Sequence, residues 1–494
     1  MQALRIALAQ INSTVGDFDG NCALIVEWAS RAAQEGAQVV VFPELAVTGA
    51  PLAGFALRPE SARESRAALG RLAVALDRAG CGDVAVVVGY LDGDDRGPLD
   101  SAAILFGGAV VSRYDRHEKT RTLSITEVNG FRLGLTIGED LRQPDGAVPA
   151  YAAAGVDVLV CLDADPFGLG RTDARRVEFT RRAVEAGVPF ACSNPVGGQK
   201  QLVYGGSSMV VDSDGTLLGR APEFTEHLLC VDIDVPADRR PDRAEVDGWV
   251  VDRHVLPDLL VRGWDRMPLS VAPALADDEQ VWSALVTAVR DHAHKNGFAS
   301  VTMDLSGSVG SAVVAAMAVD ALGAQAVHAT FVPSHQPPEG LPSDVAELLR
   351  RNGIHIESRS RRSAPTTWAD EHGHLVLATD NSTELGQGYG TQGYRTALGF
   401  EPSLAETIRD AALEGFAPLR DVPQSLLWNI ARWRNKAAAE RGEIPPIPEE
   451  LIDGAPTKLG DAAERLRHAY PIGPKIMPSS VLDRRVPVAN VWAK

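Results

Sequence analysis

Short apolar runs of strand length alternate with segments of helical spacing along most of this 494-residue chain. The runs LRIALAQI at 4–11 and AQVVVFPEL at 37–45 are typical of buried strands, whereas residues 20–35 carry apolar side chains at helical spacing. Strands that alternate with helices in sequence build sheets that are covered by those helices. The pattern therefore predicts an α/β fold with a mixed sheet, rather than an all-helical or all-β one.

The alternation is interrupted once, between about residues 236 and 270. This stretch is rich in Pro, Asp and Arg, a composition typical of a connector. A second series of helix and strand signals follows and includes the strand run SVTMDL at 300–305. The length is also large for a single domain. We expect a first domain over 1–240, a linker over 241–270, and a second domain with a C-terminal tail over 271–494.

Composition limits the partners and the compartment. The formal net charge is -17, and such a surface repels phosphate backbones, so we expect no nucleic-acid partner, although a local pocket can still take a nucleotide. The five cysteines form no metal or redox spacing pattern, which indicates reduced thiols. No run spans a membrane and the N-terminal residues lack a signal-peptide pattern. We expect a soluble, cytoplasmic protein with no membrane partner.

The stretch VVVFPELAVTG places Glu44 directly after a strand run, where a carboxylate can act as a general base. Alone, a Glu that caps the next turn would look the same. Its companions are IALAQINSTVGDFDGN, GLTIGEDLRQPDG and SNPVGGQKQLVYGGSSMVVDSDG. Together these stretches resemble the nitrilase, or carbon–nitrogen hydrolase, family over about half of the chain. The resemblance implies an N-terminal α-β-β-α sandwich.

The resemblance also implies a Glu–Lys–Cys triad, in which Glu44 matches the base. The family's Cys-Glu-Asp run here reads Gly-Glu-Asp and begins at Gly138, so the nucleophile position holds a glycine. Arg116 aligns with the lysine, and Lys119, three residues on, is the alternative. Covalent catalysis of this kind needs a thiolate. The triad positions therefore predict an impaired amidase site.

Another thiol in the same half of the chain could replace the missing nucleophile. Cys161 and Cys192 both lie at or near the ends of predicted strands. Two small buried side chains are the simpler interpretation, since free cysteine is among the most buried residue types.

The stretch MDLSGSVGSAVVAAMAVDALGA joins a strand to a helix through a Ser/Gly turn, where backbone N–H groups can hold an anion. With LATDNSTELGQGYGT, GFAPLRDVPQSLLWNIARWRN and the tail GPKIMPSSVLDRRVPVANVW, it resembles the synthetase domain of the glutamine-dependent NAD synthetases. The resemblance implies an adenine-nucleotide α-hydrolase-like parallel sheet with helices on both faces. It also implies ATP and Mg²⁺ as ligands, with no tightly bound cofactor. In that family, ammonia from glutamine passes to the synthetase domain, which amidates deamido-NAD.

The resemblance assigns the nucleotide-binding positions of this half. They are Ser306, Gly307, Ser308, Gly310, Ser311 and Thr383, with Glu384 at a magnesium position. The family loop reads Ser-Gly-Gly-x-Asp-Ser, so Gly310 stands where a magnesium-binding Asp is expected, and Gln424 replaces a phosphate-contacting lysine. Each lost charge-assisted contact costs about 1.5–3 kcal/mol. Magnesium with fewer acidic ligands binds poorly.

The substitutions fall at nucleophile and ligand positions, while the apolar runs VVVFPEL, VDVLVCL and AVVAAMAV stay intact. This pattern predicts a pseudoenzyme with a binding, regulatory or assembly role, as a homo-oligomer or together with an active relative. One alternative is an active amide ligase that uses ammonia or an altered substrate through Glu384 and Asp304. The other is a glutamine or amide sensor that uses Glu44 and Glu139 beside the space at Gly138.

Overall fold

The structure is a computed structural model in which the chain divides into two compact units. The first comprises Met1–Pro166, Thr172–Gly197 and Tyr204–Ala274, and the second Phe167–Arg171, Gly198–Val203 and Leu275–Lys494. The structure describes residues 2–52, 59–94, 97–116, 121–141, 143, 146–199, 202–235, 243–257, 265–331, 341–356, 373–379 and 416–452.

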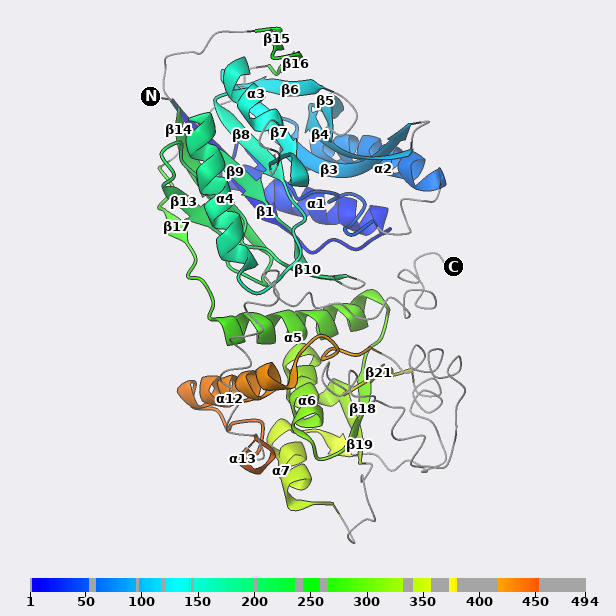
Figure 1. Cartoon of the computed structure of the whole chain (residues 1–494). Coiled ribbons are helices and arrows are strands. Elements are labelled where there is room, and N and C mark those ends of the chain that lie inside the picture. Colours follow the sequence, from blue (N-terminus) through cyan, green and yellow to red (C-terminus); the bar gives the residue numbers. More distant parts are fainter. Residues whose placement is uncertain are drawn as a thin grey trace. The chain divides into compact units, whose positions relative to one another are not determined.

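Two sheets form the first unit (Figure 1). The six-stranded sheet is ordered β14 (His227–Val235), β1 (Gln2–Gln10), β2 (Val39–Val41), β3 (Ala85–Asp94), β4 (Gly97–Phe106) and β5 (Ala109–Asp115). The nine-stranded sheet is ordered β15 (Glu245–Val246), β16 (Trp249–Val255), β6 (Thr122–Val128), β7 (Phe131–Ile137), β8 (Val158–Leu162), β9 (Phe190–Ser193), β12 (Met209–Val211), β13 (Leu217–Arg220) and β17 (Ser270–Val271). The strands β10 (Val196–Gln199) and β11 (Leu202–Gly205) pair as a hairpin.

Helices cover the outer faces of these sheets. The helices α1 (Phe18–Gln34) and α2 (Pro59–Leu76) pack on the six-stranded sheet, while α3 (Ala147–Ala154) and α4 (Arg171–Ala186) pack on the nine-stranded one. Short η2 (Asp77–Cys81) and η3 (Gly138–Leu141) turns follow α2 and β7. This is the α-β-β-α sandwich expected from the sequence.

The core lies between the two sheets, and the sequence pattern explains why. Leu4, Ile6 and Leu8 of β1 and Leu133 and Leu135 of β7 are fully buried in one cluster. Strands that are covered on both faces read as continuous apolar runs, which is the pattern seen in the sequence. The ends of these strands are therefore held in place by a packed core.

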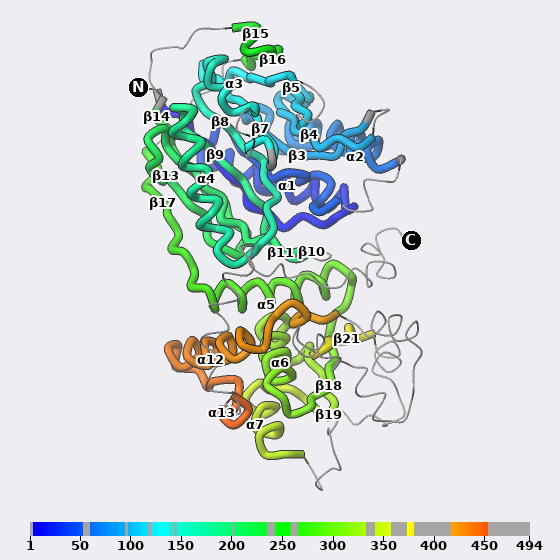
Figure 2. The backbone as a smooth tube through the Cα atoms, viewed as in Figure 1, coloured from blue at the N-terminus to red at the C-terminus, as the bar shows by residue number. Residues whose placement is uncertain are grey.

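A parallel sheet forms the centre of the second unit. Its order is β20 (His355–Ile356), β19 (Val327–Phe331), β18 (Val301–Leu305) and β21 (Leu375–Leu377). The helices are α5 (Asp277–Lys295), α6 (Val309–Leu322), α7 (Ser343–Asn352), α12 (Gln424–Glu440) and α13 (Glu449–Ile452), with a short η4 turn (Ala324–Ala326). Figure 2 shows α5, α6 and α12 next to one another. The parallel α/β class expected for this half is confirmed.

One carboxylate at the edge of the helix layer contacts all three of these helices. Asp320 of α6 accepts a hydrogen bond from Trp282 Nε1 of α5 at 2.9 Å, and bonds from Arg434 Nε and Nη2 of α12 at 2.7 and 2.9 Å. A bidentate guanidinium–carboxylate pair adds geometric specificity as well as energy. The helix layer is therefore fixed by polar contacts as well as by apolar packing.

Part of the stretch expected as a linker over 241–270 is strand in the structure. Val246 and Trp249 are buried where β15 and β16 join the nine-stranded sheet, and β17 ends at Val271. The short alternating pattern of this segment was hidden among its Pro, Asp and Arg residues. Among the described residues, no helix is long and apolar enough to cross a membrane.

Candidate functional site

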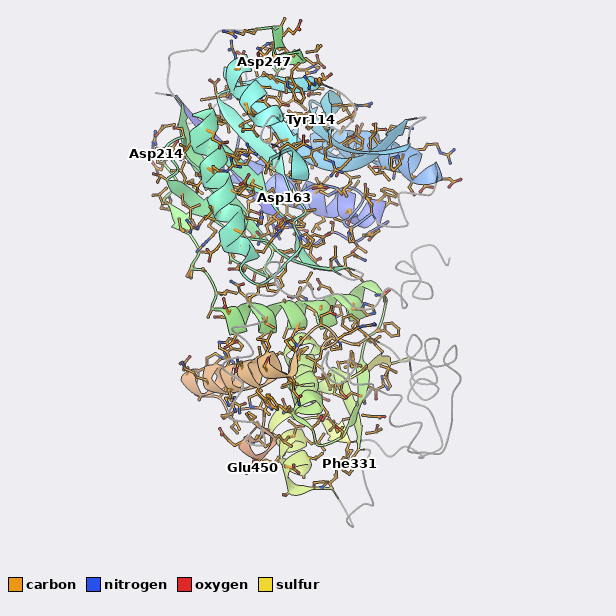
Figure 3. The ribbon with its side chains drawn as sticks, in the orientation of Figure 1. Tyr114, Asp163, Asp214, Asp247, Phe331 and Glu450 are labelled. Atoms are coloured by element: carbon orange, nitrogen blue, oxygen red, sulfur yellow. The ribbon has the colours of Figure 1, made fainter. Side chains whose placement is uncertain are left out.

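Four strand ends bring the expected amidase positions together in the first unit. Glu44 follows β2, Arg116 follows β5, Gly138 follows β7 and Asp163 follows β8. Figure 3 labels Asp163. The Glu44 N–H donates to the Asp163 carbonyl at 3.2 Å, and Arg116 Nη1 lies 3.8 Å from Glu44 Oε1. The geometry therefore places Glu44, Arg116 and Gly138 in one site. Lys119 and the side chain of Glu139 lie outside the described residues.

The nucleophile position is not merely without a side chain, because its space is taken. A Cβ built on Gly138 would lie 2.8 Å from Glu44 Oε2, closer than real Cβ contacts come, and 3.9 Å from Asp163 Oδ1. Gly138 also has a φ of +41°, a backbone conformation that favours glycine. The carboxylate of the retained base thus fills the volume in which a nucleophile's side chain would begin.

Asp100 of β4 completes this site, although no sequence motif singled it out. Arg116 Nη1 donates to Asp100 Oδ2 at 3.4 Å and also lies 3.8 Å from Glu44 Oε1, so this guanidinium lies next to both carboxyl groups. Burial, followed by the neighbouring Asp100 charge, raises the pKa of Glu44 well above its usual value. Burial likewise raises the pKa of Asp100. Two largely buried carboxyl groups, with side chains 12% and 10% exposed, beside one guanidinium therefore favour sharing a proton over ionising together.

This carboxyl pair predicts a gain in stability when its charge is removed. Because the folded-state pKa of Glu44 is raised, its contribution to stability is present below the pKa of the unfolded chain and is lost as pH rises through the raised value. We expect Glu44→Gln to stabilise the fold at pH 8 by about 0.5–2 kcal/mol, with a smaller gain at pH 4. Urea unfolding across this range measures the difference.

The matched control for Glu44→Gln is Glu27→Gln on the outer surface of α1. The Glu27 side chain is 54% exposed and pairs only locally, with Arg31 at 2.5 Å. Exposed pairs of this kind contribute about 0.3–0.5 kcal/mol. A Glu44→Gln variant that loses stability at pH 8, or that changes no more with pH than the control, would contradict the shared-proton interpretation.

A second row of buried charges supports the site. Arg175 of α4 donates from Nε to Asp163 Oδ2 at 3.2 Å and lies 3.6 Å from Asp165 Oδ2. Asp140 Oδ2 accepts hydrogen bonds from the Tyr114 hydroxyl at 2.8 Å and from a backbone N–H at 3.0 Å. Figure 3 labels Tyr114 and Asp163. The framework that orients the strand ends is therefore in place, and what the site lacks is the thiol.

The two alternative thiols are buried within neighbouring strands. Cys161 in β8 and Cys192 in β9 are both fully buried, and they are register partners on neighbouring strands. Burial raises the pKa of the Cys161 thiol well above its ordinary value, which disfavours a thiolate. Neither cysteine therefore has the exposure that an attacking nucleophile needs.

The Ser/Gly loop of the second unit joins β18 to α6 as expected, and its hydroxyl groups bond to one another. Ser308 caps the helix, since its Oγ accepts from the Ser311 N–H at 3.3 Å. The Ser308 N–H donates to Ser306 Oγ at 3.4 Å, and Ser311 Oγ donates to the Ser308 carbonyl at 2.9 Å. Two backbone N–H groups that could face an anion are thus taken by the loop's own serines.

The structure describes only some of the other predicted positions in this half of the chain. Gly307 has a φ of +79°, which suits the tight turn before the helix. Asp304 accepts a hydrogen bond from the Thr330 hydroxyl on the neighbouring strand. Thr383 and Glu384 lie outside the described residues. Across the part of the chain that the structure describes, no group of three or more His, Cys, Asp or Glu side chains could hold a metal ion.

Gly310 leaves little room for the acid that the family resemblance expects there. A Cβ at this position would lie 3.0 Å from the Thr379 carbonyl oxygen at the end of β21. Gly→Ala within a helix normally stabilises by roughly 0.5–1 kcal/mol. We expect Gly310→Ala to gain nothing or to lose up to about 1 kcal/mol, because backbone must move.

Gly70 in α2 provides the matched comparison for Gly310. A Cβ there meets no atom within 4 Å, so Gly70→Ala should show the full helical gain of about 0.5–1 kcal/mol. Thermal or urea unfolding of both variants measures the contrast. Equal gains in stability for Gly310→Ala and Gly70→Ala would show that the backbone after β21 moves easily. A larger side chain would then be tolerated at Gly310.

Comparison with known proteins covers both units. The chain matches the carbon-nitrogen hydrolase family over residues 5–238 and the NAD synthase family over residues 281–357. It is 30% identical to the glutamine-dependent NAD(+) synthetase of Xanthomonas campestris pv. campestris, over 92% of this chain and 82% of the relative. The enzyme of the same name from Thermotoga maritima is 27% identical over 98% of this chain and 88% of its own length.

A solved structure shares the fold of the whole chain. The glutamine-dependent NAD+ synthetase of Acinetobacter baumannii, in complex with adenosine diphosphate, superimposes with a TM-score of 0.72 at 24% identity. The match covers 95% of this chain and 88% of that one. At this level of identity the likeness establishes the fold.

Proposed function

This chain belongs to the glutamine-dependent NAD(+) synthetase family, and from this premise we propose that it is a non-catalytic member that acts by binding or assembly. It would neither hydrolyse glutamine nor form the amide of deamido-NAD. Its partners would be further copies of itself or an active relative with matching surfaces. Its five cysteines, none in a disulfide, suit a reducing compartment, so we place the protein in the cytoplasm.

The contact between Glu44 and the nucleophile position carries this proposal. An amidase of the nitrilase type needs a thiol beside its base, and here Glu44 Oε2 lies 2.8 Å from where the Cβ of residue 138 would be. The base is then held by Asp100 and Arg116 rather than by a nucleophile. The same contact disfavours an amide sensor, because Glu44 Oε2 narrows the space at Gly138 that the amide would use.

The second unit supports the proposal independently. ATP and Mg²⁺ would be the ligands of an active synthetase site, but the described residues of the Ser/Gly loop do not fit them. Gly310 offers no carboxylate, and the N–H groups of Ser308 and Ser311 already have hydroxyl acceptors. A magnesium–triphosphate group needs acidic ligands and open N–H donors at this turn.

The test is a direct assay of both half-reactions with the purified chain. We expect ammonia release from glutamine below about one ten-thousandth of that of the Xanthomonas campestris relative, since removal of a nucleophile alone costs several orders of magnitude. We also expect no AMP from ATP with deamido-NAD and ammonia. Ammonia release that Glu44→Gln abolishes would overturn the proposal for the first unit. AMP formation that Glu384→Ala abolishes would establish the ligase alternative.

A further inference from the structure

A glycine within β3 lies directly against the turn that carries Glu44. A Cβ built on Gly89 would overlap the Leu45 backbone nitrogen and would lie 2.8 Å from both the Cα and the carbonyl carbon of Glu44. Real Cβ atoms essentially never come so close to other heavy atoms. Because all three atoms belong to the backbone, no flexible side chain could move aside. Only a glycine at this position therefore allows the Glu44 backbone to lie against β3.

The sheet register shows which face of β3 the turn covers. Gly89 is the register partner of Ala102 in β4, which in turn pairs with Tyr114 in β5, labelled in Figure 3. Residues opposite each other on antiparallel strands share a face, and Ala102 and Tyr114 belong to the core between the two sheets. Asp100 lies two residues from Ala102 and is therefore on the same face. The turn thus covers the inner face of the sheet, next to Asp100.

Hydrogen bonds to β3 hold both ends of this turn. The Phe42 N–H donates to the Val87 carbonyl at 2.9 Å, and the Val47 N–H donates to the Gly89 carbonyl at 3.0 Å. Residues 43–46 therefore lie between two bonds whose acceptors are only two residues apart on β3. The chain cannot run straight here, and Glu44 lies in the resulting turn.

Leu45 closes the turn in a backbone conformation that is uncommon for its residue type. Its φ is +56°, and the Ala46 N–H donates to the Pro43 carbonyl at 3.2 Å, so Leu45 occupies the second central position of a β-turn. A positive φ at this position normally selects Gly or Asn. Strain of this kind persists only where the surrounding structure fixes the backbone, and here the contact with Gly89 does so.

We propose that Gly89, together with the left-handed backbone at Leu45, positions Glu44. The close contact with β3 sets the place from which the Glu44 side chain reaches both residue 138 and Arg116. A methyl group at position 89 would push the Glu44 backbone away from β3 and would move its carboxylate from residue 138. The position of this carboxylate does not depend on whether the chain hydrolyses glutamine.

The test measures how Glu44 influences a thiol placed at position 138. In the full chain carrying Gly138→Cys, alkylation by iodoacetamide is followed as a function of pH through the mass of the peptide that contains position 138. A carboxylate beside a thiol disfavours the thiolate, so adding Glu44→Gln should lower the pH midpoint of alkylation by about one unit. Adding Gly89→Ala instead should lower it by the same amount, because Glu44 then lies away from the thiol.

The two changes together distinguish positioning from general damage. Gly89→Ala combined with Glu44→Gln should lower the midpoint no further than either change alone, whereas independent effects would add. Additive shifts, or a midpoint that Gly89→Ala leaves unchanged, would overturn the proposal. A midpoint unaffected by Glu44→Gln would also overturn it, since Glu44 would then not lie beside residue 138.

Two further variants provide the control and a substitute. Gly93→Ala, in the same strand, places a methyl group 3.1 Å from the Ala62 Cβ, a side-chain atom, and should leave the midpoint unchanged. Leu45→Val puts a β-branched residue at a positive φ, which disfavours the turn, and should lower the midpoint as Gly89→Ala does. Circular dichroism checks that each variant is folded. If Gly89→Ala does not fold, a folded Leu45→Val with an unchanged midpoint would contradict the proposal.

Discussion

The Gly138→Cys variant is expected to release ammonia from glutamine at least about 100-fold faster than the unaltered chain. The substitution returns a thiol to a site that still has its base, because Glu44 Oε2 lies directly beside this position. Burial raises the pKa of Glu44, which makes its ionised carboxylate a stronger base towards a thiol. Glu44 must withdraw by a few tenths of an ångström, which the end of a flexible side chain can do.

The gain in activity should come with a loss of stability. A non-glycine residue at a φ of +41° costs about 1–3 kcal/mol, and the crowding against Glu44 adds to it. The double variant Gly138→Cys with Arg116→Lys should be faster still. A lysine ammonium offers a compact charge to a developing oxyanion, whereas the Arg116 fork is held by Glu44 and Asp100.

Two controls separate restored chemistry from background. Gly138→Ser has the same backbone strain without a thiol and should stay inactive. Glu44→Gln on top of Gly138→Cys should remove the gained activity, because the thiol then lacks its base. If Gly138→Cys folds and is alkylated at position 138 by iodoacetamide, yet releases no ammonia, then the substrate pocket has also changed and the missing thiol is not the only defect.

The sequence predicted the parts of this molecule that depend on local patterns. Alternating strand and helix signals sufficed for the α/β class and for the strand–turn–helix at Ser306, because each is determined by a few neighbouring residues. Glu44 and Gly138 could be placed in one site through motif resemblance. The structure adds that they touch, and this depends on how two sheets pack rather than on either motif.

Asp100 and Arg175 show why the other residues of the site could not be predicted from the sequence. Asp100 lies within a strand run, GPLDSAAILF, and reaches Glu44 only through the register of β4. Arg175 is one of several arginines in α4, and its burial depends on which face of the helix meets the sheet. Such partners are distant in sequence, so a periodic pattern carries no information on the pairing. An isolated acid in an apolar strand was the only available signal for Asp100.

Arg175→Met is expected to destabilise the first unit by about 3–5 kcal/mol, the typical cost of removing one partner from a buried charge network. The guanidinium is almost fully buried, 3.2 Å from Asp163 and 3.6 Å from Asp165, and it also donates to the Gly206 carbonyl at 3.1 Å. Methionine fills much of the volume but leaves two buried carboxylates without their shared cation. In a domain of this size the midpoint of thermal unfolding should fall by roughly 10 °C.

The neighbouring position on the same helix tests whether burial causes this effect. Arg176 also pairs with an aspartate, Asp173 at 3.7 Å, but its side chain is 43% exposed. Arg176→Met should therefore change stability by less than about 1 kcal/mol, as exposed pairs do. The loss in Arg175→Met should shrink in acid, because a protonated carboxyl group no longer needs a cation, whereas salt should alter it little. Equal losses in the two variants would mean that Arg175 contributes through helix surface charge and that Asp163 is held by other contacts.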